Sequence, residues 1–84
     1  MLYSAYPNPF NPSTTVKFDV SKVSNVDINV YDMNGNFIDN LVSKNMMPGK
    51  YEITWDAFGL PSGVYLIHMH TLDGSFTEKV LLVK

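Results

Sequence analysis

Two histidines are the first candidates for chemistry in this sequence of 84 residues. His68 and His70 stand two positions apart in an alternating apolar segment. Because side chains along a strand alternate between its faces, both imidazoles would lie on one face, where their nitrogens could bind a metal ion. No third ligand accompanies them, so we expect two polar residues on a solvent face and no metal site.

The residue types of other active sites are present without a catalytic pattern. Ser, His and Asp occur, but no Gly-x-Ser-x-Gly sequence does, and turn formation already explains Ser62 and Gly63. The Asp residues form no Asp-x-Asp-x-Asp calcium loop. There is no glycine-rich phosphate loop, and the absence of cysteine excludes thiolate chemistry and disulfides. We therefore expect no enzyme activity and no cofactor.

Charge and composition exclude further classes of protein. Six Lys, no Arg and eight acidic residues give a net charge of -2, whereas a nucleic-acid-binding domain usually carries a basic patch with Arg. The 45% hydrophobic fraction is too high for a disordered segment. The sequence contains no run of about 18 apolar residues, the length that a membrane-spanning helix needs. Residues 1–5 lack the basic and apolar parts of a Sec signal peptide, so we expect any export signal of that kind to lie upstream.

The length suits one domain of residues 1–84, with a proline-rich opening segment (1–13) before a β-sandwich (14–84). Prolines 7, 9 and 12 oppose helix formation and hold their neighbours extended. Tyr6 and Phe10 bracket the first two prolines. We expect a stiff loop whose two aromatic rings cover the edge of the core.

Alternating apolar and polar residues predict six strands, and a seventh if 2–5 pairs. The expected strands are 16–20, 26–31, 37–42, 51–55, 64–70 and 76–83. Asn34–Gly35 predicts a type I′ turn, 43–47 a loop, and 72–75 a second hairpin. The strand at 64–70 is apolar on both faces in its first half, which is typical of a central strand. Turn signals at this spacing indicate an antiparallel sandwich.

The predicted core contains thirteen residues from these strands: Val16, Phe18, Val20, Val26, Ile28, Val30, Ile53, Trp55, Tyr65, Ile67, Met69, Val80 and Leu82. One corner sharpens the prediction. The sequence from Leu60 to Tyr65 resembles a tyrosine corner, in which the Tyr65 hydroxyl would hydrogen-bond to backbone a few residues upstream.

The order of five motifs carries a resemblance over almost the whole chain. They are Tyr-Pro-Asn-Pro-Phe-Asn-Pro-Ser-Thr-Thr at 6–15, Val-Asp-Ile-Asn-Val-Tyr-Asp-Met-Asn-Gly at 26–35, the Gly-to-Trp-Asp strand at 49–56, Ser-Gly-Val-Tyr at 62–65 and the final apolar strand at 79–84. Together they resemble the type A C-terminal sorting domains of the type IX (Por) secretion system. The strand–turn element and the Gly-Val-Tyr strand are similar, more distantly, to the immunoglobulin-like part of the flagellar hook-capping protein.

The resemblance implies an all-β fold, an immunoglobulin-like or fibronectin-III-like sandwich of six to seven strands. It implies a signal that directs an N-terminal cargo through the outer-membrane translocon, from the periplasm to the cell surface or medium, with a sortase-like surface protease removing the domain. A signal needs a surface that a receptor can recognise. The candidate recognition residues are Tyr6, Pro7, Asn8, Pro9, Phe10, Gly63, Val64, Tyr65, Lys79 and Lys84.

A non-catalytic structural or adhesive sandwich is the alternative. Such a stalk, carbohydrate-associated or hook-cap-like module would show a surface aromatic platform, for which Tyr3, Tyr31 and Phe37 are available. Exposed strand edges would permit a homodimer. A last strand at a sheet edge would also permit receptor binding by strand addition.

Overall fold

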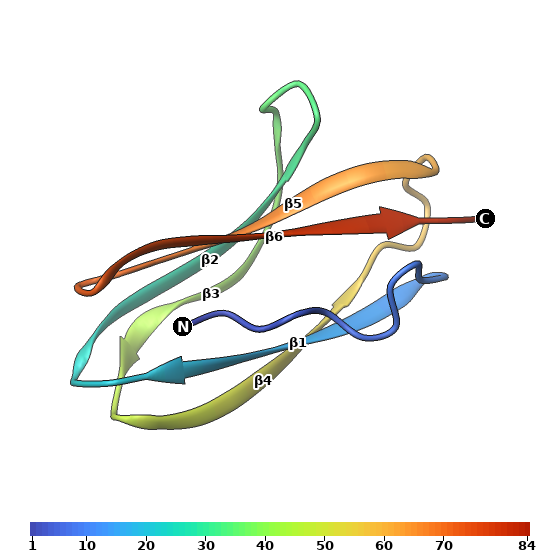
Figure 1. The fold of residues 1–84 in the computed structure, drawn as a ribbon. Helices are drawn as coiled ribbons and strands as arrows, with labels where there is room; N and C mark the ends of the chain where they lie inside the picture. The colour runs from blue at the N-terminus through green and yellow to red at the C-terminus, as the bar shows by residue number, and fades with distance from the viewer.

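A computed structural model describes residues 1–84 as two antiparallel sheets packed face to face (Figure 1). The six strands are β1 (Ser13–Val20), β2 (Ser24–Asp32), β3 (Phe37–Met46), β4 (Gly49–Asp56), β5 (Gly63–Thr71) and β6 (Gly74–Leu82). One sheet contains β1 and β4, and the other has the order β3-β2-β5-β6. The all-β sandwich predicted from the sequence is confirmed. The structure contains no helix that could cross a membrane.

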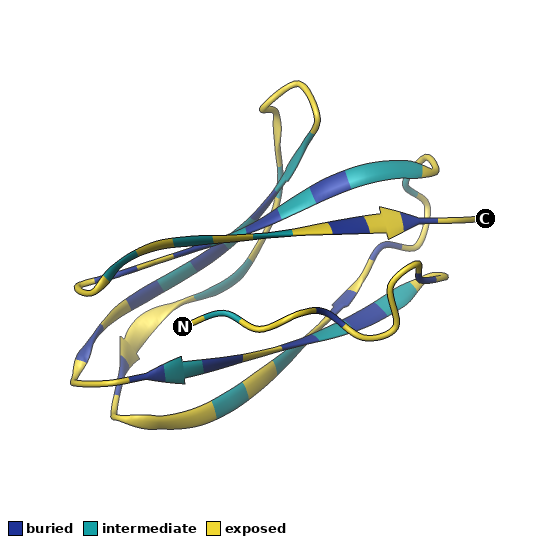
Figure 2. Cartoon of the chain, viewed as in Figure 1, coloured by how far each residue is buried: buried dark blue, intermediate teal, exposed yellow.

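Alternation explains which side of each strand faces inward. In β1 the buried residues Val16, Phe18 and Val20 alternate with more accessible polar residues, and β2 and β5 show the same period (Figure 2). Twelve of the thirteen predicted core residues are buried. Ile53 is the exception and is only half-buried, because β4 forms an edge of its sheet. Four further apolar residues are buried: Ala5, Phe10, Met46 and Ala57.

The prediction of a central strand at 64–70 is confirmed. β5 pairs with β2 on one side and with β6 on the other. Ile67 and Met69 are fully buried toward the opposite sheet, while Leu66 and His68 on the outer face are half-buried. Because β5 has a neighbouring strand on each side and the other sheet against one face, most of its residues are at least half-buried. This favours apolar side chains along most of its length.

The predicted loop at 43–47 is wrong, because β3 continues to Met46. The hairpin partner β2 begins at Ser24, and the ladder pairs Ser24 with Met46 and Asn25 with Asn45. Met46 is buried at the end of this ladder. The polar run at 43–45 therefore marks an exposed edge strand rather than a loop.

The type I′ turn at Asn34–Gly35 is also wrong, since no residue other than glycine has positive φ. The Gly35 N–H donates to the Asp32 carbonyl at 3.1 Å, and Gly35 alone is left-handed with φ of 83°. The Asp32 carboxylate accepts the Asn34 and Asn36 N–H groups, both at 2.9 Å. These bonds favour a type I turn followed by a glycine bulge, with Asp at the first position. The second hairpin, with Thr71 paired to Gly74, forms as predicted.

Residues 1–12 close one lateral side of the sandwich (Figure 1). The stretch 2–5 is not a full strand, but Leu2 bridges to Phe18 and the Tyr3 N–H donates to Lys17 at 2.9 Å. The segment then crosses to the other sheet, where Phe10 bridges to Leu82 in parallel. The opposite lateral side is formed by the free edges of β3 and β4.

Candidate functional site

The structure brings the three predicted recognition segments together at one end of the sandwich. The last residues of β6 lie between β5 and the opening segment. On one side Gly63 pairs with Leu82 and Tyr65 with Val80. On the other side residues 8–10 run alongside β6. We refer to 6–10, 63–65 and 79–84 as the C-terminal cluster.

Backbone hydrogen bonds fasten the end of β6 to the opening segment. The Phe10 N–H donates to the Leu81 carbonyl at 2.9 Å, and the Val83 N–H donates to the Phe10 carbonyl at 3.0 Å. The Asn8 side chain adds two bonds, from its Nδ2 to the Lys79 carbonyl at 3.1 Å and from the Leu81 N–H to its Oδ1 at 2.9 Å. Although β6 is last in the sheet order, a partner strand cannot use these groups without displacing the opening segment.

The two aromatic residues of the opening segment have different environments. Phe10 is buried, and its ring lies 5.5 Å from that of Trp55. Tyr6 is 82% exposed, while its backbone pairs with Thr15 of β1. The prediction that an aromatic ring covers the edge of the core is therefore confirmed for Phe10 and wrong for Tyr6, whose ring is exposed to solvent.

Tyr65 has the predicted tyrosine-corner geometry. Its hydroxyl donates to the Pro61 carbonyl at 2.7 Å, and its buried ring meets Trp55 edge-on at 5.4 Å. Next to it, Val64 is half-buried on the outer face, opposite Leu81. Within this segment Tyr65 stabilises the corner, and Val64 is the side chain that reaches the outer surface.

The two lysines of the cluster are exposed and lack a carboxylate partner. Lys22 and Asp73 form the only ion pair in the structure, so Lys79 and Lys84 are available to an external anion. The Lys84 N–H donates to the Ser62 hydroxyl at 3.1 Å, which fixes the end of the chain beside the corner.

Two shallow hollows border Lys84. One, of about 490 Å³, is lined by Asn11, Pro12, Ala57, Phe58, Gly59, Leu82 and Lys84. The other, of about 470 Å³, lies over Pro7, Pro9, Phe10, Asn11, Val83 and Lys84. Sequence reasoning missed Asn11 and Phe58 as surface residues of this region. Phe58 is 85% exposed. Its position among the turn-forming residues Asp56, Gly59 and Pro61 could have indicated an exposed apolar side chain.

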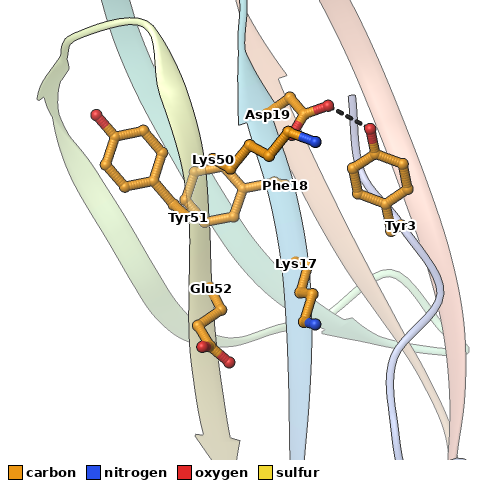
Figure 3. Close-up of a pocket in the computed structure, with 7 residues that line it drawn as sticks. All are labelled: Tyr3, Lys17, Phe18, Asp19, Lys50, Tyr51 and Glu52. Carbon is orange, nitrogen blue, oxygen red and sulfur yellow. Dashed lines mark hydrogen bonds between the residues drawn. The ribbon is translucent and has the colours of Figure 1, made fainter.

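A third hollow, of about 520 Å³, lies against β1 and β4 (Figure 3). Its charged side chains alternate in sign: in the β1–β4 ladder Lys17 lies opposite Glu52, and Asp19 lies opposite Lys50. The Tyr3 hydroxyl donates to the Asp19 carboxylate, a bond that raises the pKa of Tyr3, with desolvation adding to the effect. Since the cations and anions balance, this hollow does not select a ligand of either charge.

The histidines lie on the outer face of the larger sheet, as the alternation predicts. The Nδ1 atom of His68 is 3.2 Å from the Thr77 hydroxyl, and that of His70 is 3.1 Å from the Ser75 hydroxyl. No group of three or more His, Asp or Glu side chains is arranged to hold a metal ion. Each imidazole thus has a hydroxyl partner on β6.

The aromatic residues considered for an adhesive platform do not form one. Tyr31 and Phe37 meet edge-on at 6.1 Å at the end of the β2–β3 hairpin. Tyr3 is bound to β1 of the other sheet. The pair on the hairpin is too small to stack an extended ligand, and Tyr3 cannot join it.

Three comparisons with known proteins were informative to different degrees, and only the family model agrees with the motifs. No curated protein matches the chain. A DNA glycosylase from Pseudomonas fluorescens, solved bound to DNA with an abasic site analogue, is similar over 99% of this chain and 30% of its own, at 13% identity and a TM-score of 0.49. The model of the secretion system C-terminal sorting domain matches residues 4–84. With nearly every residue matched, the chain belongs to the family of C-terminal sorting domains of the type IX (Por) secretion system.

Proposed function

We propose that this domain directs an N-terminal cargo across the outer membrane, that the translocon binds the C-terminal cluster, and that a sortase-like surface protease removes the domain. Family membership supports a sorting signal and export to the cell surface or the medium. A signal of this kind acts by being bound, so it requires a defined surface and no active site. In this proposal the precursor passes through the periplasm before it reaches the translocon.

The observation that carries the proposal is the convergence of three segments that lie far apart in the sequence. Asn8 and Lys79 are 71 residues apart, yet they are joined by a hydrogen bond. Around them the ring of Tyr6, the outer face of Val64 and the ammonium groups of Lys79 and Lys84 are accessible to a partner. Since both lysines lack internal partners, an acidic surface on the translocon would be complementary to them.

A test by truncation would be hard to interpret. Removing 80–84 also removes Val80 and Leu82, each only 1% exposed, and these residues belong to the core. A loss of export could then reflect unfolding alone. Reversing the charge of exposed residues changes the recognition surface and leaves the core intact.

The experiment uses a fluorescent reporter with a Sec signal at its N-terminus and residues 1–84 at its C-terminus, in a host with a working type IX system. The variant K79E/K84E reverses the charge of the cluster. The single variant K44E is the control, since Lys44 is exposed on β3, away from the cluster. We expect wild type and K44E on the surface or in the medium, and K79E/K84E retained in the periplasm.

Three outcomes would each contradict one part of the proposal. Retention of the wild-type fusion in the periplasm, with the domain shown to be folded by protease resistance, would contradict the sorting role itself. Export of K79E/K84E at the wild-type level would contradict recognition through the two lysines. Surface display of a fusion that keeps its full mass on a denaturing gel would contradict cleavage.

A further inference from the structure

The outer edge of β4 carries unused backbone groups in a regular pattern. Thr15, Lys17 and Asp19 of β1 form their backbone bonds with the opening segment. The N–H and C=O groups of alternate residues point to opposite sides of an antiparallel strand. The backbone groups of the even-numbered residues of β1 therefore point toward β4. By the register of the ladder, their bonded partners are Gly49, Tyr51, Ile53 and Trp55. The backbone groups of Lys50, Glu52, Thr54 and Asp56 therefore point outward.

The core is also least covered on this side of the sandwich. Five of the eight half-buried apolar residues around the core lie on β3 or β4: Ile38, Leu41, Val42, Tyr51 and Ile53. Figure 2 shows both strands mainly in the colours of exposed and intermediate residues. An additional strand beside β4 would shield the inner side chains of Tyr51 and Ile53 from water.

The side chains of β4 are complementary to those of a second, antiparallel β4. With a two-fold axis at Ile53, Lys50 lies opposite Asp56 of the second copy, and Glu52 lies opposite Thr54. In this register every outward-facing backbone group meets an outward-facing group, as an antiparallel ladder requires. Opposite charges facing each other across strands stabilise the pair, and like charges destabilise it.

Neighbouring registers are worse. An axis at Glu52 places that carboxylate opposite its own copy, and an axis at Thr54 places Glu52 opposite Asp56. An axis at Tyr51 pairs Lys50 with Glu52 but leaves Thr54 and Asp56 outside the ladder. Moving the axis to a point between two residues would bring an outward-facing group against one that already bonds β1.

We propose that β4 is a homodimer interface, through which two copies of this chain join their smaller sheets about a two-fold axis at Ile53. The other edges do not offer the same surface. β3 pairs with β2 through two register shifts, and irregular edges resist pairing. The end of β6 is occupied by residues 8–10.

The pairing is self-limiting and independent of the proposed function. In each copy the other side of β1 is covered by residues 1–6, so the joined sheet has no second β4 edge to extend. The backbone bonds of residues 8–10 and 79–83 join these segments to each other and to β5, so pairing through the outer edge of β4 uses none of them.

Cysteine cross-linking tests both the interface and its register, because the chain contains no cysteine. At the axis the two Ile53 residues form a non-hydrogen-bonded pair, whose Cα separation of about 4.5 Å suits a disulfide. We expect oxidised I53C to become a covalent dimer, while E52C and T54C, whose thiols would not face their own copies, cross-link far less. A dominant cross-link at position 52 or 54 would overturn the register.

Sedimentation of the purified chain over a range of concentrations tests the interface without cysteine. K50E should weaken the dimer at least about tenfold, because it places Glu opposite Asp56 at both ends of the ladder. E52P removes an outward N–H that β1 does not use, so it should fold and abolish the dimer, whereas E52A keeps the N–H and the dimer. K44E should leave association unchanged. Wild-type protein that stays monomeric at its highest soluble concentration, or a dimer unaffected by K50E and E52P, would overturn the proposal.

Discussion

The tyrosine corner gives the sharpest test of how this small sandwich is stabilised. Tyr65→Phe removes one hydroxyl whose bond to the Pro61 carbonyl is 2.7 Å long, while the ring keeps its contact with Trp55. Pro61 is exposed, so its carbonyl regains water in the variant. The loss should therefore be about 1 kcal/mol rather than the roughly 3 kcal/mol of a fully buried unpaired group.

Urea unfolding followed by far-UV circular dichroism measures this loss. With a denaturant slope of about 1 kcal/mol/M for a protein of this size, the midpoint should fall by about 1 M. In thermal unfolding the same change corresponds to a decrease of about 4–8 °C. Far-UV dichroism is preferable to fluorescence, because the single Trp55 touches the mutated ring.

A second tyrosine provides the matched control. Tyr51 also donates to a carbonyl four residues upstream, that of Met47, at 2.7 Å, but this bond is exposed to solvent. Tyr51→Phe should cost less than about 0.5 kcal/mol, since water replaces an exposed bond at little cost. A Tyr65→Phe variant as stable as wild type, or no less stable than Tyr51→Phe, would refute the assignment of the corner.

Three further variants test other contacts. Hydrogen bonds from the Asn36 backbone and side chain, and from the Asn34 backbone, outweigh desolvation and lower the pKa of Asp32 below its ordinary value of 3.8. The stability that this carboxylate contributes is therefore present above about pH 4 and is lost as the pH falls. Asp32→Asn should flatten the acid limb of a Tm–pH profile, and an unchanged acid limb would contradict this. Asn8→Ala removes both side-chain bonds to β6 and should lower the hydrogen-exchange protection of the Leu81 amide, with a cost of about 1 kcal/mol; unchanged protection would show that the bonds are not stabilising. Leu82→Ala should cost about 2–5 kcal/mol in urea unfolding, a large part of the stability of a small domain, whereas Leu81→Ala at the exposed neighbouring position should cost far less.

Local patterns predicted the parts of the fold that local physics determines. Alternation located all six strands and twelve of the core residues, because burial on one face repeats every second residue. The corner at 60–65 was predictable for the same reason, since the hydrogen bond of Tyr65 spans only four residues.

The error in the turn came from a side chain beside it, whereas the other differences came from contacts that the local pattern does not contain. Asn34–Gly35 is a strong signal for a type I′ turn, but the Asp32 carboxylate binds the turn amides and favours another type. Ile53 alternates correctly, yet its burial depends on whether a further strand lies beside β4. The pairing of residues 8–10 with β6 joins the two ends of the chain, and no short-range pattern encodes it.

The bonds between the opening segment and β6 make the order of each depend on the other. Asn8 and Lys79 are 71 residues apart in the sequence, and the backbone of Phe10 bonds to Leu81 and Val83. Without residues 79–83, the Phe10 backbone would lose both of these partners, and the first residues of β5 would lose theirs. A cut at one end of the domain should therefore be detectable at the other end, as faster hydrogen exchange of the Phe10 amide.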